Sequence, residues 1–226
     1  MKILAIDTST KNFSLAVADG DRVLKFKNVV LKKVLSSSII PAINQILKQA
    51  KVSLSTLDGF AVGLGPGSFT SLRVGLSTIK GLTFALSKPV VGISSLDVIA
   101  QSVKDEAEDI CVVCDARRNL LYAGIFSVRN NQLTRKGDYL LTTVEDLAKQ
   151  VREETLFVGD GIGLFRDQIK SAVKKGKVRF ADESHWYPQA QYLAQLAHPR
   201  FTRREFDDAG RLVPVYLYPQ DCQIVR

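Results

Sequence analysis

The sequence has few of the side chains that enzymes use for metal binding and nucleophilic catalysis. Its 226 residues include only three cysteines and two histidines, and no HExxH sequence of a zinc peptidase is present. Cys111 and Cys114 form a CxxC pair, but they lie in the apolar run 110–114. In a strand, residues three apart point to opposite faces, so the two thiolates cannot share a metal. We therefore expect neither a zinc site nor a redox pair, and we expect both cysteines to be buried.

Long apolar runs are also absent. No stretch reaches the ~18 apolar residues that a membrane-spanning helix needs. Only four apolar residues separate Lys2 from Asp7, too few for the core of a signal peptide. Hydrophobic residues make up 46% of the chain and charged residues 24%, which is ordinary for a globular protein. These features predict a cytoplasmic protein without a membrane partner.

The net charge of +8 is unevenly distributed along the chain. Residues 1–103 hold 12 Lys/Arg and 5 Asp/Glu, whereas residues 104–226 hold 19 and 18. A basic cluster between Arg22 and Lys33 is compatible with binding to RNA or to an acidic protein. Because the cluster has no interleaved aromatic residue beyond Phe26 and no RNA-binding signature, we favour a solvated strand face.

Residues 63–75, GLGPGSFTSLRVG, are the most informative stretch. They follow the apolar strand 60–62 and open into a helix expected from about Ser71 to Leu86, with Ser68, Thr70 and Ser71 as candidate N-caps. A strand, a glycine turn and a helix N-terminus suit a bound anion, but they also suit a tight turn without a ligand. The stretch lacks the lysine of a P-loop and the glycine spacing of a Rossmann fingerprint or a nucleophile elbow.

The order of elements predicts an α/β fold with two lobes. The first half contains an antiparallel meander of three strands and then alternating helices and strands. Its expected strands are 2–7, 13–18, 22–30, 60–62 and 90–93, and its expected helices are 38–50, 71–86 and 95–103. The charged stretch 104–109 predicts a boundary, giving lobes 1–103 and 104–226. The second half begins in the same way, with strands at 110–114, 121–128 and 133–141 and helices at 144–152, 164–173 and 189–198.

The sequence resembles the TsaB (YeaZ) family over nearly its whole length. GPGSFTSLRVG, preceded by KILAIDTST, carries the resemblance most specifically. The segments PVVGISSL (89–96), DAR (115–117) with Tyr122, GDG (159–161) and PVYL (214–217) follow in the family's order and spacing. The resemblance implies two ribonuclease-H-like lobes of the actin, hexokinase and Hsp70 superfamily, the second of them reduced.

The resemblance also implies a function. It implies a non-catalytic scaffold subunit that pairs with TsaD for threonylcarbamoylation of the tRNA adenosine next to the anticodon. The ATPase TsaE would dock on the same assembly, tRNA would bind mainly through the complex, and the protein would form a homodimer when TsaD is absent. The alternative function is an ATP-dependent small-molecule kinase or ATPase of the same superfamily. A peptidase and a stand-alone RNA-binding protein are further options, the first disfavoured by the absent motifs described above.

The resemblance places the partner interface on the two N-terminal helices, paired as a four-helix bundle. The apolar residues expected there are Ile39, Ile40, Ile43, Ile46, Leu47, Leu72, Gly75, Leu76 and Ile79. Gly75 and Gly81 each cost about 1 kcal/mol in a helix interior, which indicates that another backbone comes close. Helices buried inside one domain explain the same apolar pattern. On the interface hypothesis, Ile43→Asp or Leu76→Arg abolishes pairing and leaves the monomer folded.

The resemblance also locates a vestigial nucleotide site. In superfamily ATPases, an acidic residue and small hydroxyl residues after the first strand contact phosphate and metal. The matching residues are Asp7, Thr8, Thr10, Gly65, Gly67, Ser68 and Asp115. Carboxylates from the two lobes, facing each other across a cleft, would hold Mg²⁺ through water, whereas turn capping explains the same residue types. We expect no catalytic residue, no metal and no cofactor; Mg-ATP belongs to the alternative function. Four positions depart from the family pattern, namely Leu35, Ser71, Leu120 and Tyr218.

Overall fold

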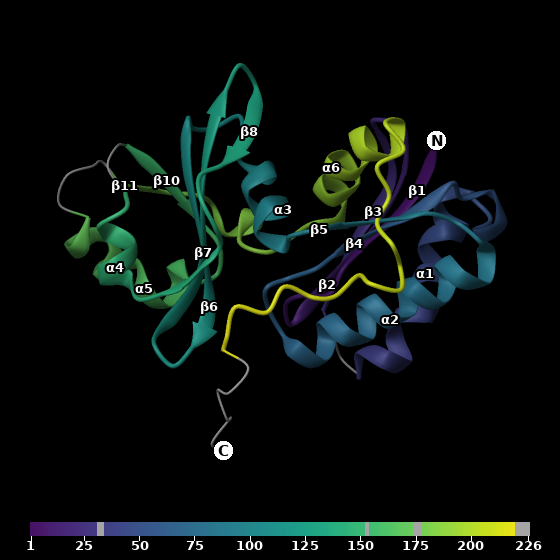
Figure 1. Ribbon diagram of the computed structural model, residues 1–226, viewed down its shortest axis with the longest axis horizontal. Coiled ribbons are helices and arrows are strands. Elements are labelled where there is room, and N and C mark those ends of the chain that lie inside the picture. Colours follow the sequence, from purple (N-terminus) through teal and green to yellow (C-terminus); the bar gives the residue numbers. More distant parts are fainter. Residues whose placement is uncertain (31–33, 152–153, 174–177, 220–226) are drawn as a thin grey trace. The chain divides into compact units, whose positions relative to one another are not determined.

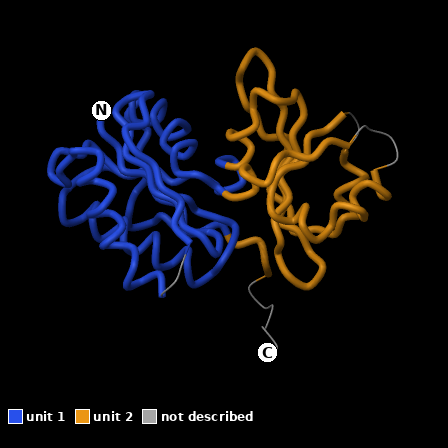
Figure 2. The backbone as a smooth tube through the Cα atoms, turned by 180° about the vertical axis from the view of Figure 1, so that it is seen from behind, with its two compact units in different colours: residues 1–98, 188–215 blue, residues 99–187, 216–226 orange. Residues whose placement is uncertain are grey.

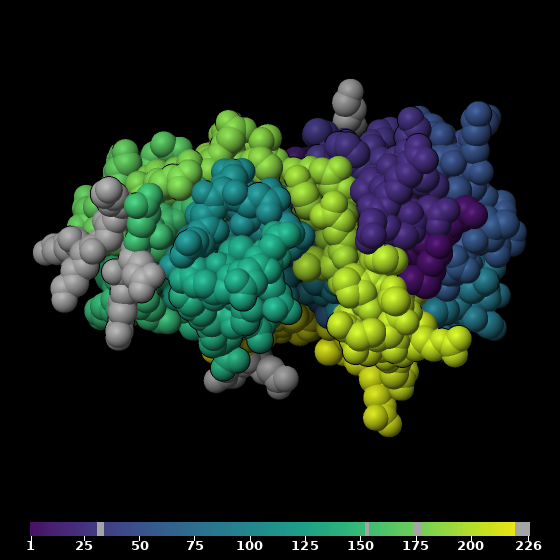
Figure 3. All heavy atoms as spheres, turned by 90° about the horizontal axis from the view of Figure 1, so that it is seen from above, coloured from purple at the N-terminus to yellow at the C-terminus, as the bar shows by residue number. Residues whose placement is uncertain are grey.

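The chain forms two compact units in the computed structural model (Figure 2). The structure describes residues 1–30, 34–151, 154–173 and 178–219. Unit 1 comprises residues 1–98 and 188–215, and unit 2 comprises residues 99–187 and 216–226. The single boundary predicted at residue 103 is therefore corrected, because residues 188–215 return to unit 1. Figure 3 shows part of this returning segment, coloured yellow-green, lying against the purple N-terminal residues.

Unit 1 is built on a five-stranded sheet in the order β3-β2-β1-β4-β5 (Figure 1). Its strands are β1 (Lys2–Asp7), β2 (Asn12–Asp19), β3 (Arg22–Val30), β4 (Gly59–Gly63) and β5 (Val90–Ile93). The first three strands are antiparallel, and β4 and β5 run parallel to β1. The parallel strands need long crossover connections, and helices supply them. The predicted meander is thus confirmed.

The helices of unit 1 cover both faces of this sheet. They are α1 (Leu35–Ala50), α2 (Phe69–Leu86), α3 (Ser95–Ser102, which continues into unit 2) and α6 (Ala190–Thr202), with a short 3₁₀ turn at Leu54–Thr56. Helices α1 and α2 pack on one face and α6 on the other (Figure 1). Helix α1 starts three residues before the predicted Ser38 and α2 two residues before Ser71.

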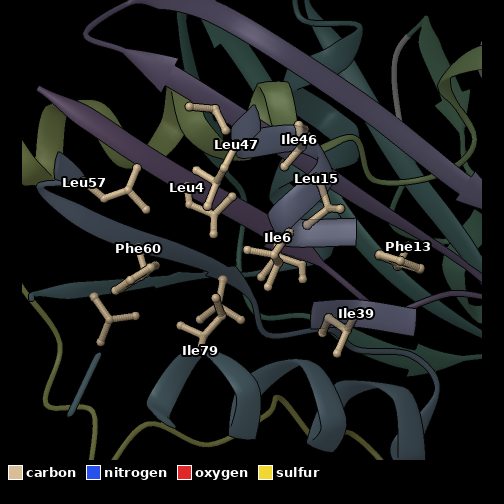
Figure 4. Close-up of a cluster of buried hydrophobic side chains, with 14 of the residues drawn as sticks. Leu4, Ile6, Phe13, Leu15, Ile39, Ile46, Leu47, Leu57, Phe60 and Ile79 are labelled. Atoms are coloured by element: carbon tan, nitrogen blue, oxygen red, sulfur yellow. The ribbon is translucent and has the colours of Figure 1, made fainter. Parts of the chain in front are cut away.

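Alternation along β1 separates the two cores of unit 1. Leu4 and Ile6 point toward α1 and α2, where Figure 4 shows the largest cluster of buried side chains. Ile3 and Ala5 point the other way, toward α6. Small residues dominate this second core, so α6 lies close to the sheet. The period-two pattern of a strand buried on both faces explains why both sets are apolar.

Unit 2 repeats the strand order of unit 1 in smaller form. Its strands are β6 (Asp109–Arg117), β7 (Leu120–Arg129), β8 (Gln132–Arg135), β9 (Leu140–Thr142), β10 (Thr155–Val158) and β11 (Val178–Phe180). The sheet order β11-β10-β6-β7-β8 reproduces β5-β4-β1-β2-β3, with β9 added beside β7. The helices are α4 (Val144–Ala148) and α5 (Ile162–Ala172), with a 3₁₀ turn at Glu183–His185. After its meander, unit 2 has the five-residue helix α4. Unit 1 has the 16-residue helix α1 at the same place in its strand order.

Several local predictions for unit 2 need correction. The run 133–141 is two strands, β8 and β9, because a turn with Gly137 at φ +76° separates them. Cys111 is buried in the core as predicted, but Cys114 is only half-buried. Lys32 and Lys33 of the basic cluster lie outside the described residues. Among the described helices, none has the length and apolarity to cross a membrane.

Candidate functional site

The carboxylate of Asp7 lies at the end of β1 and is 1% exposed. Its Oδ1 atom accepts hydrogen bonds from the Ser9 amide at 2.8 Å and the Ser9 hydroxyl at 2.7 Å. Its Oδ2 atom accepts one from the Ser95 hydroxyl at 2.6 Å. Both carboxylate oxygens are therefore engaged inside unit 1. This arrangement holds the turn after β1 against the start of α3, and it supports the turn-capping interpretation of Asp7.

The end of β1 and the turn that joins it to β2 pack against glycines of the Gly-rich turn and of α2. A Cβ atom on Gly63 would overlap the Asp7 carboxylate, one on Gly67 would overlap the Ser9 carbonyl oxygen, and one on Gly75 would overlap the Thr8 hydroxyl. Glycine is needed at these positions because another part of the same chain approaches closely. The close approach predicted for Gly75 is therefore met inside unit 1, by a side chain of the β1–β2 turn.

Backbone groups of the Gly-rich turn also have internal partners. Gly65, at φ +85°, donates its N–H to the Ser95 hydroxyl at 3.0 Å. Ser68 donates its N–H to the Ser9 carbonyl at 2.7 Å. Ser68 occupies the N-cap of α2, but its hydroxyl donates to the Ser71 hydroxyl at 3.0 Å instead of capping a backbone N–H. These hydrogen bonds join the Gly-rich turn to the turn after β1 and to the start of α3 within unit 1.

The hydroxyl groups of two further residues of the proposed nucleotide site also donate hydrogen bonds within unit 1. The Thr8 hydroxyl donates to the Ser71 carbonyl at 2.9 Å, and the Thr10 hydroxyl donates to the Asn12 carbonyl at 2.7 Å. No group of three or more His, Cys, Asp or Glu residues in the described ranges is arranged to hold a metal ion.

Asp115 repeats in unit 2 the position of Asp7 in unit 1. Its Oδ1 atom accepts from the Arg117 amide at 2.8 Å, and its Oδ2 atom lies 3.3 Å from the Arg117 guanidinium. Its own N–H donates to Asp160 at 3.1 Å, in the turn before α5. In each unit the carboxylate after the first strand is used within that unit.

We expect the ionisation of Asp7 to affect stability. Burial raises the pKa of this carboxyl above its ordinary value, although hydrogen bonds from Ser95 and Ser9 act in the opposite direction. The folded state therefore holds the proton more tightly than the unfolded chain does. The contribution of Asp7 to the free energy of unfolding should fall as the pH rises above about 4, the ordinary pKa of aspartate. Asp7→Asn removes this contribution. The free energy of unfolding of the wild type minus that of the variant should therefore be largest at low pH. Urea unfolding between pH 4 and 7 measures the difference, and a difference independent of pH would contradict the prediction.

The four departures from the family pattern have structural roles. Leu35 is buried in the core at the start of α1. The Ser71 carbonyl and hydroxyl accept the bonds described above. Leu120 opens β7, and the Tyr218 hydroxyl donates to the Ala116 carbonyl at 2.7 Å. The Tyr218 ring also meets Tyr122 edge to face, at 6.1 Å between centroids.

The interface residues predicted on α1 and α2 require a correction. All of them except Ile40 are buried within unit 1. Ile43 is 2% exposed, whereas Ile40 is 45% exposed. The reason is that helical periodicity identifies the stripe facing the protein's own sheet. A partner bound to these helices would meet the opposite stripe of each helix.

The outward stripe of α2 carries two aromatic residues that the sequence reasoning missed. Phe69 is 52% exposed and Phe84 is 64% exposed. Arg73 lies over the Phe69 ring, 3.8 Å from its centroid. Gly81 is exposed on the same stripe, and a Cβ atom there would meet no atom of the described residues within 4 Å. We call the exposed stripe of Phe69, Arg73, Ser77, Gly81 and Phe84, with Ile40 of α1, the outer helix face. The fifteen-residue spacing of the two phenylalanines places them on one side of α2, which was the available signal.

Comparison with known proteins identifies the family. The family profile described as TsaD, tRNA N6-adenosine threonylcarbamoyltransferase, matches residues 30–222. The tRNA threonylcarbamoyladenosine biosynthesis protein TsaB of Bacillus subtilis is 29% identical over 221 residues, covering 96% of this chain and 94% of that protein. The TsaB protein of Buchnera aphidicola from Schizaphis graminum is 31% identical over 196 residues, covering 84% and 89%.

Solved structures agree with this assignment. YeaZ from Pseudomonas aeruginosa superposes with a TM-score of 0.83 at 29% identity, covering 96% of this chain and 99% of that one. A ROK hexokinase from Thermus thermophilus superposes with a TM-score of 0.54 at 13% identity, covering 89% of this chain and 100% of that one. The second likeness shows the fold alone. The profile match, the relatives and the repeated sheet order together show that the chain belongs to the TsaB (YeaZ) branch of the TsaD family.

Proposed function

We propose that this protein takes part in tRNA threonylcarbamoyladenosine biosynthesis as a non-catalytic subunit that pairs with TsaD. The names of its relatives support the pathway. The structure of the candidate nucleotide site supports the non-catalytic role, because both carboxylates that could bind a metal have partners within their own units. In this proposal, TsaE and tRNA join the assembly formed with TsaD, and the protein acts in the cytoplasm.

The outer helix face is the observation that supports pairing most directly. Phe69 and Phe84 of α2 and Ile40 of α1 are exposed, and the two helices lie on the same face of the unit 1 sheet (Figure 1). Aromatic residues are enriched at the buried centres of protein interfaces, where a few of them supply most of the binding energy. The exposed Gly81 lowers helix stability, and no contact among the described residues requires glycine there. A partner helix lying close to α2 provides a reason for glycine at this position.

Substitution of Phe84 tests the proposal. The purified protein is mixed with TsaD from the same organism, and the complex is measured by light scattering together with threonylcarbamoyl transfer to tRNA in the presence of the other subunits. Phe84→Asp places a carboxylate in an apolar contact, so we expect the affinity for TsaD to fall by about 100-fold, or about 2.7 kcal/mol. Transfer should fall in parallel.

Leu164→Asp is the matched control. Leu164 is 68% exposed on α5 of unit 2, so this variant adds the same charge at a similarly exposed apolar position on the other unit. We expect it to bind TsaD within about twofold of wild type. If neither variant changes binding, the interface is elsewhere. If the wild-type protein forms no complex and transfer does not depend on it, the scaffold function is wrong, and Mg-ATP binding by the isolated protein becomes the next measurement.

A further inference from the structure

Strand β3 forms one edge of the unit 1 sheet. It is last in the strand order and, among the described residues, pairs only with β2. The pairing register is regular over six residue pairs, from Lys25 opposite Val17 to Val30 opposite Asn12. The strand has nine residues and contains no proline. Because a long, regular edge strand presents a row of backbone N–H and C=O groups, β3 is open to the addition of a further strand.

The face of β3 on the α1 side of the sheet is cationic. Side chains alternate along a strand, so Lys25 and Lys27 lie on the same face, opposite Val17 and Leu15 of the core that α1 covers. The Lys27 ammonium donates a hydrogen bond to the Gln45 side chain of α1 at 3.0 Å. The strand contains no Asp or Glu, so its own sequence offers these lysines no carboxylate.

The face of β3 on the α6 side carries exposed apolar residues. Phe26 lies opposite Ala16 of the core that α6 covers, and Val30 follows four residues later on the same face. Phe26 is 48% exposed and Val30 is 68% exposed. Residues directly opposite each other on neighbouring strands pack side by side, so an added strand would cover both side chains.

We propose that the edge of β3 binds an extended segment of a partner protein in which apolar and acidic residues alternate. On the added strand, apolar residues lie opposite Phe26 and Val30, and acidic residues lie opposite Lys25 and Lys27. Backbone pairing supplies the affinity of such a complex, and the alternate side chains supply its selectivity. The surface belongs to a different element from the outer helix face, so the inference goes beyond the proposed function.

Two other occupants fit the edge less well. RNA offers phosphates to the lysines, but it offers no strand to the unpaired backbone and no apolar side chain to Phe26. Symmetric pairing of β3 with a second copy places no carboxylate near Lys25 or Lys27, because the strand contains none. Lysines on an edge strand also discourage pairing with uncharged strands. The combination of charge and exposed apolar area therefore favours an acidic strand from another protein.

Fluorescence anisotropy with a labelled peptide tests the inference. The probe Val-Thr-Thr-Glu-Val-Glu, capped at both ends, pairs antiparallel with β3. It then places its valines opposite Val30 and Phe26 and its glutamates opposite Lys27 and Lys25. We expect a Kd on the order of 100 µM for this peptide. The peptide Val-Thr-Thr-Lys-Val-Lys should bind about tenfold more weakly, because it brings like charges together.

N-methylated forms of the probe test whether the backbone pairs. Methyl groups on the second, fourth and sixth residues remove the N–H donors from one edge of the peptide. Methyl groups on the first, third and fifth residues remove them from the other edge. A strand added to β3 pairs through one edge only, so one methylated peptide should lose binding and the other should keep it. Binding that survives in both would contradict strand addition.

Variants of the protein test the side-chain selectivity. Lys25→Glu/Lys27→Glu should exchange the preference and bind the lysine peptide about tenfold more tightly than the glutamate peptide. Phe26→Thr should weaken both peptides about threefold without changing the preference. Arg166→Glu/Lys170→Glu on α5 is the matched control, because it reverses two exposed cations of unit 2. Its affinity for the glutamate peptide should stay within about twofold of wild type.

Three results would overturn the inference. The first is equal binding of the glutamate and lysine peptides by the wild type. The second is tRNA binding that Lys25→Glu/Lys27→Glu abolishes while neither peptide binds, which would assign the strand to RNA. The third is self-association in sedimentation velocity that Phe26→Thr abolishes, which would assign the edge to a second copy. None of these measurements involves TsaD, so their failure is separate from a failure of the Phe84→Asp experiment.

Discussion

Replacing Ile43 by aspartate should unfold unit 1. Ile43 is 2% exposed and packs between α1 and the sheet, in the cluster that contains Ile6 and Phe60 (Figure 4). Removing a buried isoleucine side chain costs about 2–5 kcal/mol, and placing a carboxylate in the same apolar site adds to this loss. The total approaches the roughly 5–15 kcal/mol by which a whole domain is stable. This expectation replaces the prediction from sequence that Ile43→Asp leaves the monomer folded.

Hydrogen exchange distinguishes the two expectations. Amides of β1 and β4 should lose their protection in the Ile43→Asp variant. Ile40→Asp is the matched control, since Ile40 lies three residues earlier on α1 and is 45% exposed. Its effect on stability should stay within about 1 kcal/mol. The only tryptophan, Trp186, lies in unit 2, so its fluorescence reports separately on that unit. Retained protection of β1 and β4 in Ile43→Asp would show that the position tolerates exposure.

Gly67→Ala should destabilise unit 1 by about 3 kcal/mol, the upper end of the usual cost of overpacking. The added methyl group would overlap the backbone carbonyl of Ser9, and a backbone atom cannot turn away as a flexible side chain can. The change also weakens the hydrogen bond from the Ser68 amide to the same carbonyl. Urea unfolding followed by circular dichroism, with the slope of the transition compared between variants, measures the loss.

Gly81→Ala is the matched substitution, and we expect it to raise the free energy of unfolding that Gly67→Ala lowers. Gly81 lies inside α2, and nothing in the described chain lies within 4 Å of an added Cβ atom. Alanine is favoured over glycine in a helix interior by about 1 kcal/mol, so the isolated protein should become more stable. On the proposed function, the same variant should bind TsaD more weakly because the methyl group enters the contact. Equal effects of Gly67→Ala and Gly81→Ala on stability would contradict the close packing of the Gly-rich turn.

The candidate nucleotide site shows where residue type alone misleads. Asp, Ser and Thr after a first strand serve either a ligand or the fold, and the sequence does not separate these uses. Ser95 supports the structural role, since it is 88 residues from Asp7 and donates a hydrogen bond to the Oδ2 atom of Asp7. No local pattern connects these two residues. Only the return of the chain from β5 into α3 brings them together.

The interface predicted on α1 and α2 is a second case in which the sequence was not sufficient. Periodicity in α1 and α2 correctly located two helices with one strongly apolar side, because burial on one side imposes a helical repeat. It could not say whether that apolar side packs on the protein's own sheet or on a partner. Ile43 on that side is 2% exposed, whereas Ile40 on the opposite side is 45% exposed. The spacing of Phe69 and Phe84 places them on one side of α2, but only the packing of α2 on its sheet shows that this side is exposed.

The sequence by itself determined the family, the superfamily fold, the antiparallel meander and its repetition in the second half. These depend on short motifs and on alternation, which act between near neighbours in the chain. Tertiary structure alone decided that residues 188–215 belong to unit 1, with α6 packed on the β1–β5 sheet. It also decided that Asp7 accepts hydrogen bonds from Ser9 and Ser95, and that the exposed side of α2 is the one carrying Phe69 and Phe84. Each of these depends on contacts between segments far apart in the sequence, whose partners are defined only when the sheet assembles.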